Sequence, residues 1–553
     1  MIAALLLVLA LQLPGGAVAS SEEQATEAAA QILAAGGNAV DAAIALHFAL
    51  AVTYPVAGNL GGGGFLLYRA PDGGAHFLDF RETAPVAAHA DLYRTPDGDV
   101  DRAAATRGWR AVAVPGAVPG LAEAHRRWGS RPWAELVAPA LRLAREGFVV
   151  DEGEAGRLAS LSDAWAADPI AAEAFLGRDG APPRPGDRLA QPRLAATLER
   201  VAAEGERALR AGAIVEELLA ASRAGGGILA AEDFRDYRPV LRPVHRIPWR
   251  GLEVLCPTPP SSGALFLHQT LVVLDAWPLA EWGRQDPRTL LLTAEASAAA
   301  FADRNRHLGD PAGMKFDPAS LLTDLALQAR RAALRPDVFR APLAGPAVNE
   351  EQHQTTHFSV VDAAGGAVAC TTTLNGGYGA KVMAPGGFLL NNEMDDFAAS
   401  PGRANLYGLV QGPANAIVPG RRPLSSMCPT IVVKDGAVDA VLGSPGGPTI
   451  LSTVLHVLLN RYVFGLDPAA SVAAPRAHRQ DLPPDLLHEP GLLTEAAAAR
   501  LTELGQPLRA VQALGDVNAI FRVAAGWQAV ADPRSSGSAR PVENPLPEVS
   551  GRK

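Results

Sequence analysis

Residues 354–362 read QTTHFSVVD and place two adjacent threonines just before a run of residues that favours a β-strand. A threonine hydroxyl is a poor nucleophile at neutral pH unless a base lies beside it. The residue's own α-amino group, with an unperturbed pKa of about 7.7–8.0, can be that base. This amine is free only when the chain is cut immediately before the threonine. The stretch therefore indicates a precursor that breaks its own backbone to create an N-terminal nucleophile.

The residues that follow predict a β-hairpin. Strand candidates cover 356–362 and 367–374, and the four residues between them suit a hairpin loop. If Asp362 pairs with Ala367, the candidate nucleophile Thr355 lies beside Thr373, Leu374 and Asn375 of the neighbouring strand. The same local pattern also fits an ordinary strand, because β-branched residues suit pleated surfaces. The chemistry alone does not choose between the two threonines.

Composition allows a large core and argues against several classes of partner. The chain has 553 residues, of which 48% are hydrophobic, and proteins of this size hide roughly three-quarters of their unfolded surface. The net charge is -9, and no cluster of Lys and Arg is mixed with aromatic residues, which argues against nucleic-acid binding. The three cysteines have no CxxC spacing and are expected to be small buried hydrophobes: Cys256, Cys370 and Cys428.

Periodicity along the chain indicates α plus β structure. An alanine-rich helix is expected over 22–35, with Gly36-Gly37 as its C-terminal signal. The polar, proline-bearing segment 336–354 lacks periodicity and reads as an exposed loop that ends at the proposed cut. The other expected pieces are strands and tight turns over 54–80, a mostly helical region over about 116–235, short strands over 240–256 and a largely helical region over 277–307.

Motifs spread over nearly the whole chain point to one family. From the candidate nucleophile onward they include TTTLN (371–375), LLNNEMDDF (389–397), RPLSSMCPTIVVKDG (422–436), GSPGG (443–447) and DPRSSGSA (532–539). Before it they include AGGNAVDAAIA (35–45), NLGGGGFLLY (59–68), DFRETAP (79–85), PPSSGAL (259–265) and ADRNRHLGDP (302–311). In this order they closely resemble the γ-glutamyltransferase (glutathione hydrolase) family, which belongs to the N-terminal nucleophile hydrolase superfamily.

The resemblance implies an α+β fold, a four-layer αββα sandwich that cleaves itself into two subunits. A leader over 1–15 would precede a large subunit, 16–354, and a small catalytic subunit, 355–553. The implied activity is hydrolysis or transfer of γ-glutamyl groups from amides such as glutathione, through a γ-glutamyl-threonine intermediate. Water, an amino acid or a peptide would accept the group, and the two subunits would stay associated. No metal, cofactor or nucleic acid is expected.

The resemblance also implies catalytic roles. Thr355 would attack the Gln354 carbonyl to give an ester that water opens, and its freed amine would then act as general base in turnover. Thr373 would hydrogen-bond the nucleophile. Gly446 and Gly447 would direct backbone N–H groups at the developing oxyanion, because glycine lets the backbone approach without an intervening side chain.

Recognition of a γ-glutamyl group requires partners for a carboxylate and an ammonium on one carbon. Arg81 suits the carboxylate, because a guanidinium binds it in bidentate geometry. The other residues implied for binding are Ser425 and Ser426 as hydroxyl and backbone donors, and Asn375, Glu393 and Asp396 for the ammonium. Residues 400–412 match a lid of the family, and Tyr407 in this lid would close over the site near Asn375.

Other functions remain open beside this one. A cephalosporin-type acylase, a poly-γ-glutamate-processing enzyme and an inactive exported binding protein could all have the same fold. Arg81 and Asp396 favour an amino-acid substrate over a β-lactam side chain, and the lid would obstruct a long polymer. His353 and His357 have the spacing of a zinc-protease helix, but Gln354 replaces the general-base glutamate and strand-forming residues follow.

The N-terminal residues predict export. Residues 2–13 form an apolar run of signal-peptide length that is too short to span a bilayer. Residues 17–19 read as a cleavage site, but the resemblance places the first mature strand at 16–20, so cleavage after Ala19 would remove a core strand. We expect a periplasmic or extracellular protein whose leader is cut upstream of Gly16 or retained as an anchor.

Overall fold

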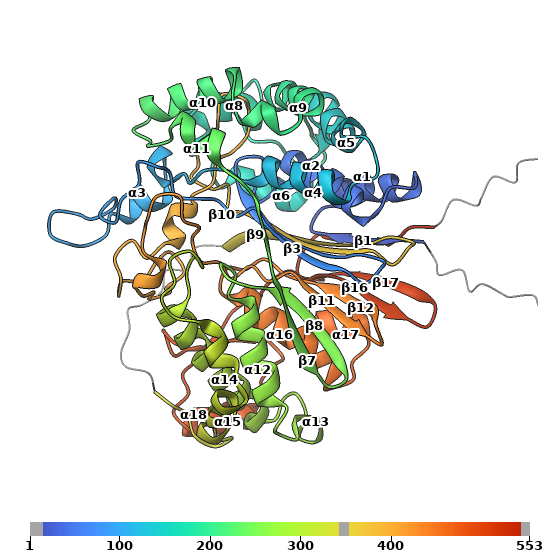
Figure 1. Cartoon of the computed structure of the whole chain (residues 1–553), viewed down its shortest axis with the longest axis vertical. Helices are drawn as coiled ribbons and strands as arrows, with labels where there is room; N and C mark the ends of the chain where they lie inside the picture. Colours follow the sequence, from blue (N-terminus) through green and yellow to red (C-terminus); the bar gives the residue numbers. More distant parts are fainter. Residues whose placement is uncertain (1–14, 342–352, 544–553) are drawn as a thin grey trace, which may run out of the picture.

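The computed structural model describes residues 15–341 and 353–543, and these residues form two stacked sheets between layers of helices (Figure 1). In them, one main sheet has seven strands and the other has six. The arrangement confirms the expected α+β class and the four-layer αββα sandwich. Most of the predicted leader and most of the predicted loop over 336–354 lie outside the described residues.

The seven-stranded sheet contains the predicted hairpin, and each of its strands is antiparallel to its neighbours. Its side chains alternate between two cores: Val18 and Val360 pack under the helices, whereas Ala19 and Val361 face the second sheet. The strand order is β18 (Ser538–Pro541), β1 (Ala17–Ser20), β9 (His353–Val361), β10 (Ala367–Gly376), β2 (Gly63–Arg69), β3 (Ala75–Asp79) and β6 (Val240–Arg242).

The six-stranded sheet lies below the first sheet in Figure 1 and is also antiparallel. Its order is β17 (Gly526–Ala531), β16 (Asn518–Val523), β12 (Ala437–Leu442), β11 (Thr430–Lys434), β8 (Leu252–Pro257) and β7 (Val244–Trp249). The end of β12 leads directly into the glycine motif at 443–447. There are also two small sheets among the described residues. One contains β13 (Ala477–His478), β14 (Leu486–His488) and β15 (Leu508–Ala510), and the other pairs β4 (Phe148–Val149) with β5 (Arg188–Leu189).

Helices cover both outer faces (Figure 1). On the seven-stranded side, α2 (Ala39–Thr53) is buried along its whole length, and its sequence is apolar on every side apart from Asp41, His47 and Thr53. Asn38 caps this helix: its side chain accepts hydrogen bonds from the N–H groups of Val40 and Asp41, and the Asp41 carboxylate accepts one from Asn38 N–H. The other helices on this side of the molecule include α1 (Glu23–Ala34), α4 (Ala117–Trp128), α5 (Trp133–Glu146), α6 (Glu152–Ala159) and α9 (Pro192–Glu204).

The region expected to be helical contains α4 to α11, and the six-stranded sheet is covered by α12 (Gly263–Leu274), α14 (Pro287–His307) and α16 (Thr449–Tyr462). The remaining helices are α3 (Arg102–Thr106), α7 (Ser162–Ala167), α8 (Pro169–Phe175), α10 (Ala213–Ala224), α11 (Ala231–Asp236), α13 (Leu279–Trp282), α15 (Asp324–Ala333), α17 (Pro468–Ala473) and α18 (Glu495–Glu503). Within the described ranges, none has the length and apolar character needed to cross a bilayer. All three cysteines are buried, as expected, and all three are free thiols.

The first described strand is an interior strand of the sheet. In β1, Val18 pairs with Arg540 of β18 on one side and with Val360 of β9 on the other. Cleavage of a leader after Ala19 would therefore remove most of an interior strand.

The predicted hairpin forms with a register shifted by one residue. Ala367 pairs with Val361 rather than with Asp362, so the connection runs over 362–366. The shift places Thr355 directly opposite Thr373.

The Asp362 side chain explains the shift. Its carboxylate accepts hydrogen bonds from the backbone N–H groups of Ala364 at 3.0 Å and Gly366 at 2.8 Å, which draws the residue into the turn. The same carboxylate accepts a hydrogen bond from Ala39 N–H at 2.9 Å, at the start of α2. The turn is therefore fixed both locally and against the helical layer.

Candidate active site

The predicted nucleophile lies near the start of β9, beside a second threonine. Thr355 pairs with Thr373 of β10, and their Oγ1 atoms are 3.1 Å apart. Thr373 Oγ1 also accepts a hydrogen bond from Asn375 N–H at 2.8 Å. Thr355 is 5% exposed and forms part of a pocket wall. The hairpin thus holds two hydroxyls within hydrogen-bonding distance at the edge of a pocket.

The end of β10 connects this pair to the predicted lid. Asn375 has a φ of +74°, in the left-handed region that asparagine tolerates better than most residues. Its Nδ2 donates to Asn392 O at 3.0 Å. The Tyr407 hydroxyl donates to Asn375 O at 3.1 Å and also bonds Asn375 Oδ1. Tyr407 therefore holds the 400–412 segment against Asn375, the residue that the sequence predicts to lie near it.

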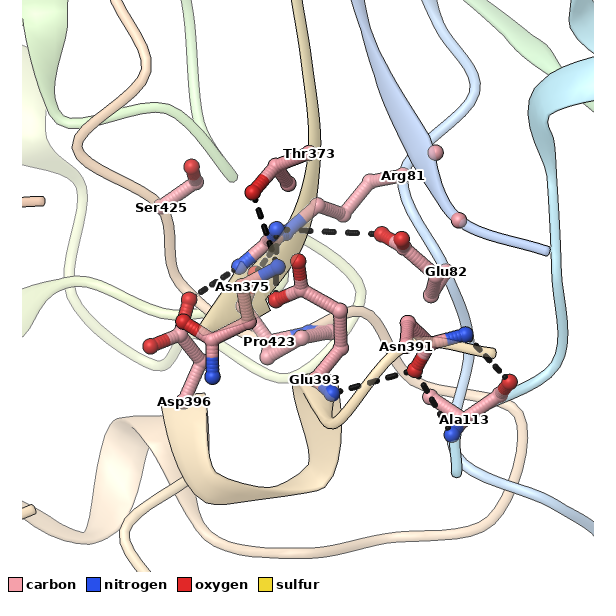
Figure 2. A network of polar contacts seen from close by, with 12 residues as sticks. Arg81, Glu82, Ala113, Thr373, Asn375, Asn391, Glu393, Asp396, Pro423 and Ser425 are labelled. Carbon is pink, nitrogen blue, oxygen red and sulfur yellow. Dashed lines mark hydrogen bonds and ion pairs between the residues drawn. The ribbon is translucent and has the colours of Figure 1, made fainter. Parts of the chain in front are cut away.

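Figure 2 shows Arg81 among three carboxyl groups. Its Nη1 lies 2.7 Å from Glu393 Oε2 and 3.7 Å from Glu82 Oε2, and its Nη2 is paired with Asp396. Its Nε donates to Pro423 O at 3.3 Å. The fold thus places Arg81, which is predicted to bind the substrate carboxylate, next to Glu393 and Asp396, which are predicted to bind the substrate ammonium.

These charges are unbalanced, because three carboxyl groups face one guanidinium. Burial raises the pKa of Glu82 to about 8, against the opposing effect of Arg81. Burial also raises the pKa of Glu393 well above its usual range. Burial opposes the charge on Arg81, but Glu393 and Asp396 outweigh this effect and raise its pKa. The cluster therefore favours a second cation, such as a ligand ammonium, beside the acids.

Glu82 is not among the predicted site residues. An adjacent Arg-Glu pair usually lies on a solvated face, but the Glu82 side chain is 0% exposed. The sequence carries no local signal for this burial, because it depends on contacts between segments that are far apart along the chain, such as that of Arg81 with Glu393.

The glycine pair predicted for the oxyanion forms a turn at the end of β12. Gly446 has a φ of +127° and Gly447 a φ of +55°, both in the region that favours glycine. A Cβ on Gly446 would lie 2.3 Å from Thr449 Oγ1. Gly447 lines the same pocket as Thr355. Both positions therefore favour glycine because of their positive φ, and position 446 also has no room for a side chain.

A buried polar network ties this turn to the strand of the nucleophile. Thr356 Oγ1 donates to Ser21 Oγ at 3.1 Å, and Ser21 Oγ donates to Asp516 Oδ2 at 3.0 Å. Asp516 N–H in turn donates to Ser444 Oγ at 2.9 Å. Burial raises the pKa of Asp516 to about 6. The structure thus places Thr356 in a supporting network and Thr355 on the pocket.

The two predicted serines also line the pocket. Ser425 N–H donates to Pro260 O at 2.8 Å, and Ser425 Oγ accepts from Met427 N–H at 3.1 Å. The backbone donor of Ser425 is therefore already used, and its hydroxyl proton is what it can offer a ligand. Ser426 Oγ accepts a hydrogen bond from Arg304 Nη2 at 3.3 Å.

Arg304 is a pocket residue that the sequence does not single out. It lies near the end of α14, within the motif over 302–311, and is 2% exposed. Its contact with Ser426 joins residues that are far apart along the chain, so only the motif itself could have drawn attention to it.

The predicted residues converge on one pocket, with two exceptions. Gly446 adjoins the wall without being part of it, and the side chain of Gln354 lies outside the described residues. The residues of the wall are Arg81, Arg304, Thr355, Thr373, Asn375, Glu393, Asp396, Tyr407, Leu409, Ser425, Ser426, Met427, Gly447, Pro448 and Ile450.

The zinc-protease interpretation does not fit the local structure. His353 and His357 lie on strand β9, so they are not one helical turn apart. Burial lowers the pKa of His357 to about 3, and its ring contacts Thr371 and Ser359. In the described part of the chain, no group of three or more His, Cys, Asp or Glu side chains could hold a metal ion.

Comparison with known proteins agrees with this geometry. The family model described as Gamma-glutamyltranspeptidase matches residues 25–542. The chain belongs to the γ-glutamyltranspeptidase family. Within this family, it is 41% identical over 512 residues to the glutathione hydrolase proenzyme of Pseudomonas sp. (strain A14), covering 92% of this chain and 88% of the relative. It is 40% identical over 527 residues to the glutathione hydrolase proenzyme of Escherichia coli (strain K12), covering 94% and 90%.

The γ-glutamyltranspeptidase fold is shared with acylases. The solved structure of a cephalosporin acylase from Bacillus halodurans matches with a TM-score of 0.84 and 26% identity, covering 96% of both chains. The αββα sandwich is therefore that of an N-terminal nucleophile hydrolase, and the site residues must distinguish the two activities.

Proposed function

We propose that this protein is a γ-glutamyl hydrolase and transpeptidase that cleaves γ-glutamyl amides such as glutathione. The observation that carries the proposal is the position of Thr355, whose hydroxyl lies 3.1 Å from that of Thr373 in the wall of the pocket that contains Arg81, Glu393 and Asp396. One pocket thus combines a hydroxyl nucleophile with charges of both signs that suit an α-amino acid. Membership of the family and the named relatives support the same activity.

Maturation is the first step of the proposed mechanism. Thr355 Oγ1 attacks the Gln354 carbonyl carbon, the peptide bond between Gln354 and Thr355 breaks, and the nitrogen takes up the hydroxyl proton as an ester forms. Water hydrolyses this ester, which restores the hydroxyl and leaves a carboxylate on Gln354. The products are a large subunit, 16–354, and a small subunit, 355–553.

The sheet supports lasting association of these subunits. The β9–β10 hairpin of the small subunit lies between β1 and β2 of the large one, with antiparallel pairing on both sides. A cut before Thr355 leaves this pairing in place.

In turnover, the free α-amine of Thr355 takes the proton from Oγ1 as the oxygen attacks the γ-carbonyl carbon of the donor. Backbone N–H groups at Gly446 and Gly447 stabilise the oxyanion. When the oxyanion collapses, the donor amide bond breaks and the leaving amine takes the proton from the Thr355 ammonium. Water then releases glutamate from the ester, or an amino-acid or peptide amine takes the γ-glutamyl group, and either reaction restores Thr355.

Substrate binding exchanges ion pairs within the pocket. In the structure, Arg81 is paired with Glu393 and Asp396. A γ-glutamyl group brings a carboxylate for Arg81 and an ammonium for the two acids, so each buried charge keeps a partner of opposite sign. Ser425 and Asn375 add a hydroxyl and an amide.

Mass spectrometry and a turnover assay on the purified protein test the proposal together. We expect two chains, the second beginning at Thr355, and release of p-nitroaniline from γ-glutamyl-p-nitroanilide and of glutamate from glutathione. A catalytically competent preparation with a single chain, continuous through 354–355, would contradict the proposed mechanism.

A cephalosporin-type acylase is the second candidate, because the B. halodurans acylase shares the fold. The two functions differ in whether the acyl group carries an ammonium for Glu393 and Asp396. We therefore expect γ-glutamyl-p-nitroanilide to be cleaved faster than glutaryl-p-nitroanilide, which lacks the amine. Preference for the glutaryl compound would favour the acylase.

Replacing Arg81 tests recognition separately from maturation. Arg81→Ala is expected to weaken kcat/KM for γ-glutamyl-p-nitroanilide by roughly 1.5–3 kcal/mol, as for other lost hydrogen bonds to charged groups. Self-cleavage should continue, because the nucleophile is unchanged. Arg193→Ala, which removes an exposed ion pair with Glu173, is the control and should leave kcat/KM unchanged. Undiminished turnover by Arg81→Ala would remove this arginine from the binding site.

The glycine turn gives another prediction. Gly446→Ala is expected to lower kcat by about 10²–10³-fold, as when an oxyanion donor is lost, because the added Cβ would meet Thr449 Oγ1 and displace the turn. KM should change little. Gly465→Ala is the matched control: its φ is also positive, +69°, and a Cβ there would meet no described atom within 4 Å. Equal kcat values for the two variants would exclude the turn from catalysis.

We also propose that the protein is exported to the periplasm or beyond. The apolar run over 2–13 supports export, and the interior position of β1 in its sheet supports a mature chain that keeps Ala17 to Ser20. N-terminal sequencing of the large subunit from the exported fraction should find a start at or before Gly16. A mature start after Ala19 or retention in the cytoplasm would contradict this.

A further inference from the structure

Arg304 is a buried cation in the pocket wall, and the hydrogen bonds that its side chain donates go to neutral groups. Its Nη1 donates to Asn305 Oδ1 at 2.8 Å, and its Nη2 donates to Ser426 Oγ at 3.3 Å. Its Nε is buried and has no hydrogen-bond partner among the described residues. Burial lowers the pKa of Arg304 to about 10, against the opposing effect of the Asp396 and Asp481 charges, so the guanidinium is still charged at neutral pH.

Other fully buried arginines have carboxylate partners. Arg81 is paired with Glu393 and Asp396, and Arg476 Nη2 lies 2.6 Å from Asp532 Oδ2. The part of the chain that the structure describes offers Arg304 no such ion pair. Asp396 and Asp481 favour the charge on Arg304 from a longer range than an ion pair. A buried charge without a directly paired counter-ion is costly, so the position of Arg304 suits a carboxylate that arrives with a ligand.

The surroundings of Arg304 define the ligand group. Arg304, Ser426 and Arg81 line the same pocket as Thr355. A planar carboxylate matches a guanidinium and can also accept from a serine hydroxyl. In the acyl part of a γ-glutamyl donor, the α-carboxylate is the one negative group.

We propose that Arg304, together with the hydroxyl of Ser426, binds the α-carboxylate of the γ-glutamyl substrate as a second guanidinium beside Arg81. This inference rests on the proposed function and adds a specificity-determining residue to its site. The bound carboxylate supplies the direct ion-pair partner that Arg304 lacks and leaves Glu393 and Asp396 for the ammonium. Arg304 therefore selects acyl groups that carry an α-carboxylate.

Two donors that differ only in this carboxylate test the proposal: γ-glutamyl-p-nitroanilide and 4-aminobutyryl-p-nitroanilide. In the processed Arg304→Gln enzyme, we expect kcat/KM for the first donor to fall at least tenfold, mainly through KM. For the second donor it should stay within twofold of the wild-type value. Arg304→Lys, which keeps the charge, should recover part of the loss, and Ser426→Ala should show a smaller loss with the same selectivity.

A purely structural role gives a different result. If Arg304 only supports the fold, its loss lowers kcat/KM for both donors by the same factor, which would overturn the inference, as would no change for either donor. The matched control is Arg306→Gln, on the same helix but exposed and outside this pocket, which should behave as wild type.

A second measurement covers the case in which Arg304→Gln fails to mature. In processed Ser426→Ala and Arg304→Lys, Ki for L-glutamate should rise while Ki for 4-aminobutyrate does not, and parallel changes would overturn the inference. Failure of the proposed function is recognised separately, because the wild-type enzyme would then not release p-nitroaniline from γ-glutamyl-p-nitroanilide.

Discussion

Thr355→Ala is expected to leave the chain uncut between residues 354 and 355 and to abolish turnover of γ-glutamyl donors. The alanine methyl group cannot attack the Gln354 carbonyl, so no ester forms and the backbone nitrogen of residue 355 is never released. The variant thus lacks the nucleophile and also the amine that would act as its base. Because one residue supplies both groups, we expect the loss of activity to be complete.

A denaturing gel and intact-mass measurement follow the cut, and γ-glutamyl-p-nitroanilide follows the turnover. Thr355→Ser keeps a hydroxyl and should still mature. Thr356→Ala is the neighbouring control: its hydroxyl donates to Ser21 rather than lining the pocket, so the variant should still be cut. A Thr355→Ala chain that splits at the same bond would eliminate the assigned nucleophile.

The site around the nucleophile could be predicted to within one residue because it is local. Two strands and a short turn place Thr355 near Thr373 with little help from the rest of the fold. The predicted register was wrong by one residue because the Asp362 carboxylate accepts hydrogen bonds from two backbone N–H groups of the turn. These bonds make Asp362 part of the connection instead of the strand. A register prediction that weighed aspartate as a turn residue would have found the correct pairing.

Residues that depend on distant contacts could not be predicted in the same way. The resemblance to the family, rather than periodicity, brought Arg81, Glu393 and Asp396 together in advance. Burial of Glu82 and the contact of Arg304 with Ser426 depend on how separate layers pack, and no local pattern records them. The four-layer architecture likewise followed from the resemblance, since the sequence pattern alone indicates only α plus β.

The closing motif at 532–539 contributes to a buried ionic network that is connected through residues 516 and 517 to the glycine turn. Asp532 Oδ2 lies 2.6 Å from Arg476 Nη2 and accepts a hydrogen bond from Val517 N–H at 2.8 Å. Its Oδ1 lies 2.9 Å from Arg534 Nη1. Arg476 and Asp532 are both 0% exposed, and burial lowers the pKa of Arg476 even with this partner. Asp532 is therefore the carboxylate that keeps the buried Arg476 charge paired.

Asp532→Ala is expected to destabilise the fold by about 3–5 kcal/mol, because removing one partner leaves the other buried and uncompensated. Urea unfolding in the single-chain Thr355→Ala background should show a lower midpoint with an unchanged slope. Asp532→Asn, which keeps the acceptor but not the charge, should be intermediate. Arg500→Ala, which removes an exposed ion pair with Glu503, is the control and should change stability by at most about 1 kcal/mol.

Substitution of Asp532 should also alter the active site. Asp532 accepts a hydrogen bond from Val517 N–H, and the preceding residue, Asp516, donates its N–H to Ser444 in the glycine turn. In a processed Asp532→Asn enzyme we therefore expect kcat to fall while KM stays near the wild-type value, since none of the residues around the substrate charges is altered.

An unchanged urea midpoint for Asp532→Ala would show that Arg476 finds another counter-charge or loses its proton. In that case the motif would have to be explained without the buried ion pair.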